Sequence, residues 1–265
     1  MRKYFFFIIK TSFSLLFFLP VISARAGHKP GKEFYQFTVY HYTTAVQEKM
    51  LDTYLEKALL PALHRIGFKN VGVFKSLAND TVENKLIYVF MPLKKLDLIK
   101  TIQDKLEADA VYQSSGAEYI NAVHTVPPYS RMEIILCEAF PLAPQMNVPD
   151  LQAAKKDRVY ELRSYESATE KIFANKVKMF NEGDEIGLFK RLNFNAAFYS
   201  SVIAGSKMPN LMYMTCYENM KDRDQHWKAF VDDPFWKKLS TMPEYQNNVS
   251  HIDITFLRPV EYSDF

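Results

Sequence analysis

The sequence lacks the motifs that identify the commonest enzyme classes. Its eight glycines form no Gly-x-Gly-x-x-Gly or related phosphate-binding pattern, which argues against a nucleotide site. It has no serine nucleophile elbow and no cysteine–histidine pair at a known catalytic spacing, so hydrolysis through such a nucleophile is not predicted. With only two cysteines, a cysteine-rich zinc site is not predicted either. We therefore expect no cofactor.

A strong charge and a long hydrophobic run are also missing. Residues 1–26 hold four basic and no acidic side chains, so their removal changes the formal net charge from +3 to −1. A nearly neutral chain has no electrostatic footprint for nucleic acid or an anionic membrane. The most apolar run, Phe13–Ile22, is shorter than the roughly 20 residues of a transmembrane helix. Neither a nucleic-acid partner nor a membrane span is expected.

The N-terminus has the three parts of a secretory signal peptide. Arg2 and Lys3 precede the apolar run Phe13–Ile22, and small residues follow it up to Ala26. We therefore expect residues 1–26 to be a signal peptide, cleaved after Ala26. The expected location of the protein is periplasmic or secreted.

An internal repeat organises the rest of the chain. Periodicity and turn residues predict the order β-α-β-β-α-β twice, in residues 33–140 and 157–265. Residues 141–156 contain three prolines and are expected to form a linker. The segment Phe37–Tyr42 aligns with Tyr160–Tyr165. The sequence thus predicts an α+β protein with two tandem ferredoxin-like domains.

Three local expectations follow from the same pattern. Leu86–Tyr88 aligns with Leu211–Tyr213 in the two repeats. Ser167 and Glu170 have the spacing of a capping box, which predicts a helix start at this point. Pro61 lies inside a predicted helix and is expected to bend its last turn.

Each predicted sheet has helices on one face only, so its other face needs a cover. Two copies in one chain can cover each other, with the sheets packed face to face as an α/β barrel. Alternation on the first strand of the second repeat puts Tyr160 and Leu162 towards the helices. It then puts Glu161, Arg163 and Tyr165 in a polar interior, with Arg163 paired to a carboxylate such as Glu161.

The last strand of the second repeat is treated in the same way. Ile252, Ile254 and Phe256 are expected to face the helices, which leaves His251 and Asp253 on the interior side with Thr255. The matching interior positions expected in the first repeat are Thr38, Tyr40, Tyr42, Arg131 and Glu133.

Several segments, in this order, resemble the NIPSNAP family across nearly the whole mature chain. In the second repeat they are Arg158–Tyr165, Ala204–Tyr213, His226–Trp236 and Leu257–Pro259, and in the first repeat Leu60–Gly67 and Val71–Phe74. The resemblance implies the dimeric α/β-barrel fold, which small monooxygenases also use. It implies no activity, because the resemblance carries over no catalytic residues.

Candidate site residues allow two interpretations each. Glu161 and Arg163 either orient a polar ligand or form a structural ion pair within the sheet interface. His251 and Asp253 either transfer protons or are a structural pair. A metal ion needs a third ligand, and no residue near them in sequence offers one, so no metal is predicted.

Other chemical groups have simpler interpretations. His226, Trp227, Phe230 and Trp236 have a helical spacing that favours core packing over a haem or aromatic-ligand box. Strand alternation places Cys137 and Cys216 on opposite faces, which favours two free thiols over a disulfide.

Two functions from different classes remain open at this point. The barrel could bind a small polar molecule through Glu161, Arg163, Tyr165, His251, Asp253 and Tyr40, with acid–base or oxygen chemistry as a further step. Alternatively, the chain is a non-catalytic binding or assembly module, which an interior filled by Tyr, Phe and Met would favour. The ligand and the oligomeric state, including a homo-oligomer, stay open.

Overall fold

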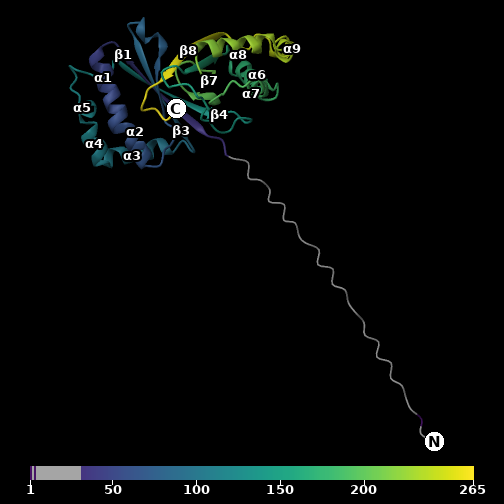
Figure 1. Cartoon of the computed structure of the whole chain (residues 1–265), viewed down its shortest axis with the longest axis horizontal. Helices are drawn as coiled ribbons and strands as arrows, with labels where there is room; N and C mark the ends of the chain where they lie inside the picture. The colour runs from purple at the N-terminus through teal and green to yellow at the C-terminus, as the bar shows by residue number, and fades with distance from the viewer. Residues whose placement is uncertain (2, 4–30) are drawn as a thin grey trace.

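The computed structural model describes residue 1, residue 3 and residues 31–265 (Figure 1). The expected signal peptide and its cleavage after Ala26 lie outside the described residues, apart from residues 1 and 3. None of the described helices is long and apolar enough to cross a membrane.

Eight strands of the described chain close into one antiparallel barrel, in the order β1-β3-β2-β8-β5-β7-β6-β4. The strands are β1 (Phe34–Tyr42), β2 (Gly72–Ser76), β3 (Lys85–Leu93), β4 (Arg131–Ala139), β5 (Val159–Glu166), β6 (Phe198–Ala204), β7 (Asn210–Tyr217) and β8 (His251–Pro259). The predicted α+β barrel is confirmed.

The two halves of the barrel have the same strand order. Within the first half it is β4-β1-β3-β2, and within the second half it is β8-β5-β7-β6. The halves are joined edge to edge, because β2 pairs with β8 and β4 pairs with β6. Closure leaves neither half with an unpaired sheet edge.

The helices lie outside the barrel, those of the first half on one flank and those of the second half on the other (Figure 1). The first half contains α1 (Ala45–Tyr54), η1 (Leu55–Leu59), α2 (Leu60–Arg65), η2 (Leu77–Asp80), α3 (Leu98–Ala108), α4 (Ala110–Ser115) and α5 (Ala117–Ile120). The second half contains α6 (Glu170–Asn181), α7 (Glu185–Arg191), α8 (Met220–Asp232), α9 (Pro234–Leu239) and η3 (Pro243–Tyr245).

Local sequence explains where several helices begin. Thr44 and Gln47 form a reciprocal capping box at the start of α1. Asp233 caps α9, whose first residue is Pro234, a position that favours proline because a backbone N–H would be unpaired there. The expected Ser167–Glu170 box is wrong: Thr169 caps α6 instead.

Two further local features concern Ser167 and Pro61. The Ser167 hydroxyl donates to the carbonyl of Asn248, 2.7 Å away, and is therefore not available to cap α6. Pro61, which cannot donate a backbone N–H, lies at the start of α2, directly after the π-helical segment η1. The helix geometry therefore changes just before the proline.

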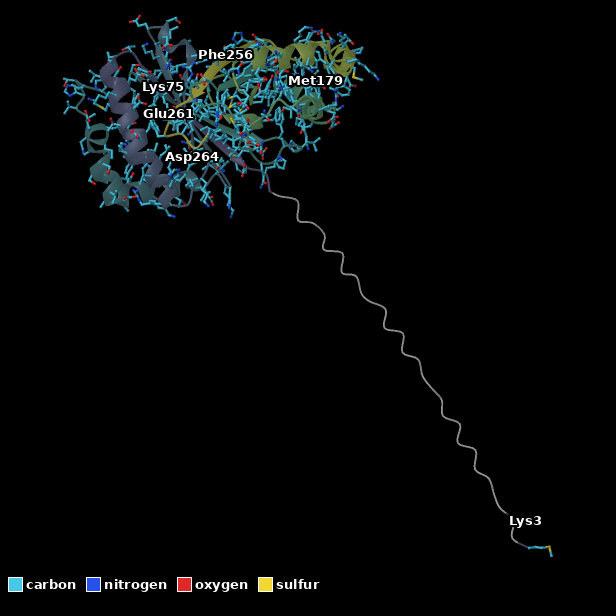
Figure 2. All side chains as sticks on the ribbon, viewed as in Figure 1. Lys3, Lys75, Met179, Phe256, Glu261 and Asp264 are labelled. Carbon is cyan, nitrogen blue, oxygen red and sulfur yellow. The ribbon has the colours of Figure 1, made fainter. Side chains whose placement is uncertain are left out.

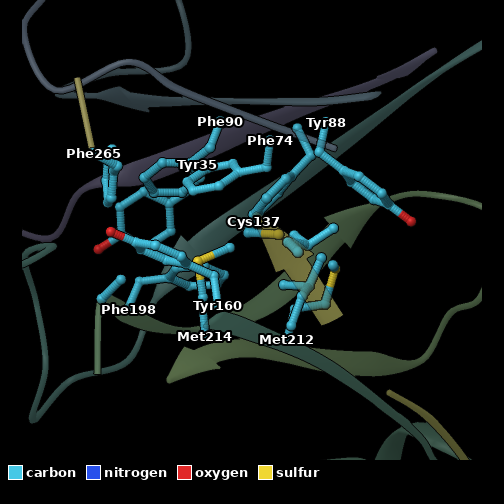
Figure 3. Packing of buried hydrophobic residues seen from close by; sticks show 14 of the residues in the cluster. Tyr35, Phe74, Tyr88, Phe90, Cys137, Tyr160, Phe198, Met212, Met214 and Phe265 are labelled. Atoms are coloured by element: carbon cyan, nitrogen blue, oxygen red, sulfur yellow. The ribbon is translucent and has the colours of Figure 1, made fainter. Parts of the chain in front are cut away.

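The barrel interior is aromatic rather than polar (Figure 3). Phe90 and Phe198, from opposite halves, stack with their ring centres 5.2 Å apart. Leu162, Met212 and Met214 belong to the same cluster, and both cysteines contribute to it, so the expectation that the cysteines lie on opposite faces is wrong. The other large rings of this cluster are Tyr35, Phe37, Phe74, Tyr88, Tyr160 and Phe265. The predicted polar interior is wrong for most of the barrel.

Strand β5 faces the opposite way from the prediction. Tyr160 and Leu162 point into the barrel, while Tyr165 packs in the cluster beneath α6 and α8. Glu161 and Arg163 share the outer face with Tyr165 and contact α8. Seven of the eight β5 residues are buried, so both faces of the strand are covered and alternation cannot tell one from the other.

The same error affects the first half. Tyr40 and Tyr42 of β1 pack beneath the helices, and Val39 points into the barrel. The orientation predicted for β8 is correct, since Thr255 faces inwards and Phe256 packs against the outer cluster. Glu133 of β4 is likewise on the inner side, as predicted.

The alignment of β3 with β7 also needs a correction. Val39 of β1 pairs with Tyr88, and its counterpart Leu162 of β5 pairs with Met214. Tyr88 therefore corresponds to Met214 and not to Tyr213. A shift of one residue moves a side chain to the other face of the sheet. Tyr213 accordingly packs in the outer cluster, while Tyr88 lies inside.

Side chains also link the barrel to its surrounding helices, and one of them, Lys75, is labelled in Figure 2. The Lys75 ammonium of β2 lies 2.7 Å from Glu48 and 2.6 Å from Asp52, both on α1. The Tyr262 hydroxyl, near the C-terminus, donates to Asp52 at 2.8 Å. This cluster fixes α1 against the barrel and the C-terminal segment.

Candidate functional site

A cavity of about 180 Å³ opens at one end of the barrel. Seven of the eight strands contribute to it, all but β2, so both halves of the chain form its wall. Its apolar lining comes from Val39, Leu86, Tyr88, Ile135, Leu162, Val202 and Met212. Its ionisable lining residues are His41, Glu133, Lys207 and Asp253. Tyr88 adds a phenol hydroxyl to its apolar ring. The cavity thus combines an apolar wall with a polar rim.

His41 and Glu133 form a close pair on the first-half side of the cavity. His41 Nε2 lies 2.8 Å from Glu133 Oε1, and Asn84 Nδ2 lies 3.1 Å from the other ring nitrogen. A neutral imidazole satisfies both contacts when Nε2–H donates to Glu133 and Nδ1 accepts from Asn84. The carboxylate therefore orients the imidazole at the cavity rim.

Asp253 is the centre of the second-half side. One of its oxygens is paired with the Lys207 ammonium, and the other lies 3.1 Å from His251 Nε2. Burial alone would raise the pKa of Asp253, but hydrogen bonds from Lys207 and His251 hold it below its usual value. Asp253 is therefore a carboxylate at neutral pH. The two residues that the sequence predicts as a pair do contact each other.

Asn210 has an unsatisfied polar atom at the cavity. Its Nδ2 donates to Ser164 Oγ at 2.8 Å, but its buried Oδ1 has no hydrogen-bond partner. The residue is only 3% exposed and lines the cavity. A buried acceptor without a donor costs roughly 1–3 kcal/mol. Asn210 therefore brings to the cavity wall an acceptor that has no donor among the described residues.

Glu161 forms the centre of a separate ion network on the outer face of β5. Its carboxylate is fully buried and accepts from Arg163 at 2.6 Å, from Arg223 at 2.8 and 3.1 Å, and from Trp227 at 2.7 Å. Arg163 also donates to the Tyr165 hydroxyl at 2.9 Å. Four donated hydrogen bonds satisfy the carboxylate without a ligand.

Residues 160–264 match the family model described as NIPSNAP. The chain carries a NIPSNAP domain. Strands β5 to β8 and the outer network around Glu161 belong to this NIPSNAP domain, which contributes ten of the sixteen residues that line the cavity. No curated protein sequence gives a significant match to the chain.

Solved structures share the fold of both halves. A candidate monooxygenase from Lactobacillus acidophilus NCFM is 12% identical, with a TM-score of 0.54 over 86% of this chain and 94% of that one. A second candidate monooxygenase, from Fusobacterium nucleatum, is 7% identical, with a TM-score of 0.58 over 87% of this chain and 94% of that one. At these identities the likeness shows the fold alone.

A shorter relative covers about half of the chain. A NIPSNAP family protein from Agrobacterium tumefaciens strain C58 is 17% identical, with a TM-score of 0.37. It covers 44% of this chain and 98% of its own length.

The structure separates the predicted site residues into three places. Within the NIPSNAP domain, Asp253 lines the cavity with His251 beside it, whereas Glu161, Arg163 and Tyr165 lie in the outer network. Tyr40 lines a different pocket of about 420 Å³, beneath the first-half helices. The expected pairing of Arg163 with Glu161 is confirmed, but its expected position inside the barrel is wrong. The predicted site residues are therefore divided between the inner and the outer face of the barrel.

Sequence reasoning missed His41, Lys207 and Asn210 at the cavity. His41 has the same strand parity as Val39, so a correct choice of the inner face of β1 would have included it. Lys207 precedes β7 in a loop, and Asn210 is the first residue of that strand. No periodic signal covers Lys207, because loop residues follow none.

Proposed function

We propose that the protein binds a small, largely apolar molecule with a hydrogen-bond donor group in the cavity at the barrel mouth. The unsatisfied Oδ1 of Asn210 is the observation that carries this proposal. Asn210 lines the cavity, and a ligand hydroxyl or N–H that reached this buried acceptor would give it the missing donor.

The size of the cavity restricts the ligand. An engineered apolar cavity of about 150 Å³ takes up benzene. The cavity here, about 180 Å³, is slightly larger and is polar at its rim. A phenol or an aliphatic alcohol of similar volume fits both properties. Apolar wall residues would provide most of the affinity, and the donor group would set the orientation.

A tandem origin of the two halves is part of the proposal. The identical strand order supports two ferredoxin-like units in residues 33–140 and 157–265, joined by the linker 141–156. Since the family model matches only residues 160–264, we infer that the first half is a more divergent copy of the NIPSNAP domain. The cavity then lies between two related but unequal halves.

Proton transfer is a second candidate function, favoured by the His41–Glu133 pair. An imidazole held by a carboxylate at a cavity is the usual arrangement of a general base. A ligand that displaced Asn84 from Nδ1 would meet an imidazole oriented by Glu133. Solved structures of two candidate monooxygenases with the same fold are compatible with chemistry on a small molecule, including oxygen chemistry. The aromatic filling of the remaining barrel favours the alternative, a non-catalytic binding or assembly module.

Matched pairs of small molecules test the binding proposal. Phenol and anisole have similar shapes, but only phenol can donate a hydrogen bond. By isothermal titration calorimetry, phenol should bind about tenfold or more tightly than anisole, because only phenol satisfies Asn210 Oδ1. Asn210→Ala should remove most of this preference. Equal binding of the two molecules, or a preference that survives in Asn210→Ala, would contradict the proposal.

Cavity-filling variants provide the second arm. Val202→Phe places a ring where the ligand would lie and should abolish binding of both molecules. Ile254→Phe, on the exposed outer face of β8, is the matched control and should leave binding unchanged. If Val202→Phe also binds phenol with the wild-type affinity, the ligand does not occupy this cavity.

A further inference from the structure

Three potential metal ligands meet at the barrel mouth. Glu166 ends β5 and pairs in register with His251, which begins β8. Asp253 follows two residues later on the same side of that strand. One ligand atom from each residue lies within 4.8 Å of the other two. Glu166 is the third ligand that sequence spacing alone could not provide, because it comes from the neighbouring strand.

The separation of these groups suits a small divalent cation. Ligand atoms about 2.1 Å from one ion, at angles near 90–110°, lie about 3.0–3.4 Å apart. His251 Nε2 and Asp253 Oδ1 are 3.1 Å apart. Small rotations of the half-buried Glu166 side chain and of the exposed His251 ring would close the remaining gap.

The kinds of donor atom narrow the choice of ion. One imidazole nitrogen and two carboxylate oxygens suit zinc, iron(II) or manganese(II) better than calcium, which prefers oxygen ligands only. With three protein ligands, a zinc ion would keep a fourth position for water, as in catalytic rather than structural sites. We propose that Glu166, His251 and Asp253 bind one first-row divalent cation, with zinc as the best match.

A second observation supports a ligand at this place. Asn210 pairs in register with Glu166, on the opposite side of it from His251, and its buried Oδ1 lacks a donor. A metal-bound water is a strong donor. Asp253 also lines the cavity, so an ion held by it would stand at the cavity rim. This site does not depend on the binding of an organic ligand.

Lys207 is the natural competitor of such an ion. Its ammonium is paired with the Asp253 oxygen that does not face His251. Glu166 and Asp253 together carry two negative charges, and the ammonium offsets only one. A divalent cation would neutralise both and would release Lys207 towards solvent.

The test uses untagged protein stripped with a chelator and then titrated with zinc chloride. Calorimetry should give one ion per chain, and the melting temperature should rise with zinc concentration because the ion binds the folded state. His251→Ala and Glu166→Gln should each weaken zinc binding about tenfold or more. His251 is exposed, so its loss should leave the melting temperature of the metal-free protein unchanged.

A matched control separates this site from surface histidines in general. His64 and Asp264 form another exposed His–Asp pair, 2.9 Å apart, and His64→Ala should leave zinc affinity unchanged. Lys207→Met should raise the affinity for zinc, since the competing ammonium is gone.

The proposal fails if the stripped protein binds no zinc at 100 µM, roughly the weak end of useful affinity. It also fails if His251→Ala and Glu166→Gln bind like the wild type, or if Lys207→Met binds more weakly. None of these outcomes affects the comparison of phenol with anisole, which is made on stripped protein.

Discussion

The guanidinium of Arg163 stacks on the indole of Trp227, 3.7 Å from the ring centre. The same guanidinium donates to Glu161, and the indole N–H donates to the other oxygen of that carboxylate. Strand β5 and helix α8 are thus joined by one stacked and hydrogen-bonded unit. Burial alone would lower the pKa of Arg163, but the neighbouring Tyr213, Tyr165 and Glu161 raise it above its ordinary value. The arginine is charged, and Glu161 compensates that charge.

This network predicts unequal effects of removing its members. Glu161→Gln should destabilise the protein by about 3–5 kcal/mol, because the buried Arg163 and the half-buried Arg223 lose their shared counter-ion. Arg163→Met should cost only about 1–2 kcal/mol, since Arg223 and Trp227 still satisfy Glu161. Urea unfolding measures both values. The exposed Arg131→Met serves as control and should stay within about 0.5 kcal/mol of wild type. A smaller loss for Glu161→Gln than for Arg163→Met would show that the carboxylate is not the centre of the network.

The two cysteines should be inert in the folded protein. Both are free and fully buried, and burial raises the pKa of the Cys137 thiol to about 12 and that of Cys216 well above its ordinary value. Because the thiolate is the reactive form, neither should react with Ellman's reagent at pH 8 until denaturant is added. Two thiols should then be titrated per chain. Rapid reaction of either thiol in native buffer would mean that the barrel interior is open to reagent.

The lowered pKa of Glu48 predicts that the free energy of unfolding falls slightly at acid pH. Burial alone would raise its pKa, but the hydrogen bond and charge of Lys75 lower it below the usual value. A lowered folded pKa stabilises the protein above the unfolded pKa of about 4.3, and this contribution is lost as the pH falls through the folded value. Glu48→Gln should therefore cost up to about 1 kcal/mol at pH 7 and almost nothing near pH 3. Chemical denaturation at several pH values checks this, and a cost that grows towards acid pH would have the wrong sign.

The N-terminal pattern predicts a processed, exported protein. If residues 1–26 are a signal peptide, material recovered outside the cytoplasm should begin at Gly27. Intact-mass measurement or N-terminal sequencing of that material is the direct check. Recovery of exported chains that still contain Phe13–Ile22 would contradict cleavage, and a purely cytoplasmic location would contradict export.

The order of the secondary structure elements could be predicted because it depends on local signals. Asp233 and Pro234, adjacent in the sequence, provide the cap and the first residue of α9. The duplicated order then implied that the halves cover each other, which the closed barrel confirms. These steps need only spacing along the chain.

The facing of β1 and β5 could not be predicted in the same way. Both strands are covered on two sides, so Leu162 and Arg163 are both buried although they point in opposite directions. Polarity usually marks the exposed face, but here a charged residue is buried against α8 because Glu161 and Trp227 compensate it. The cavity residues His41 and Asn210 come together only through strand register, which the sequence does not encode locally, and Lys207 comes from the loop before β7.

Placing the two halves of the barrel on one polypeptide frees the cavity from symmetry. By strand register, His41 and Glu133 of the first half correspond to Ser164 and Thr255 of the second. Two identical subunits would have to present the same groups on both sides of such a space. Here an imidazole with its carboxylate stands opposite two hydroxyl groups, so a guest molecule would meet two chemically different walls. Such a chamber can distinguish the two ends, or the two mirror-image forms, of what it holds.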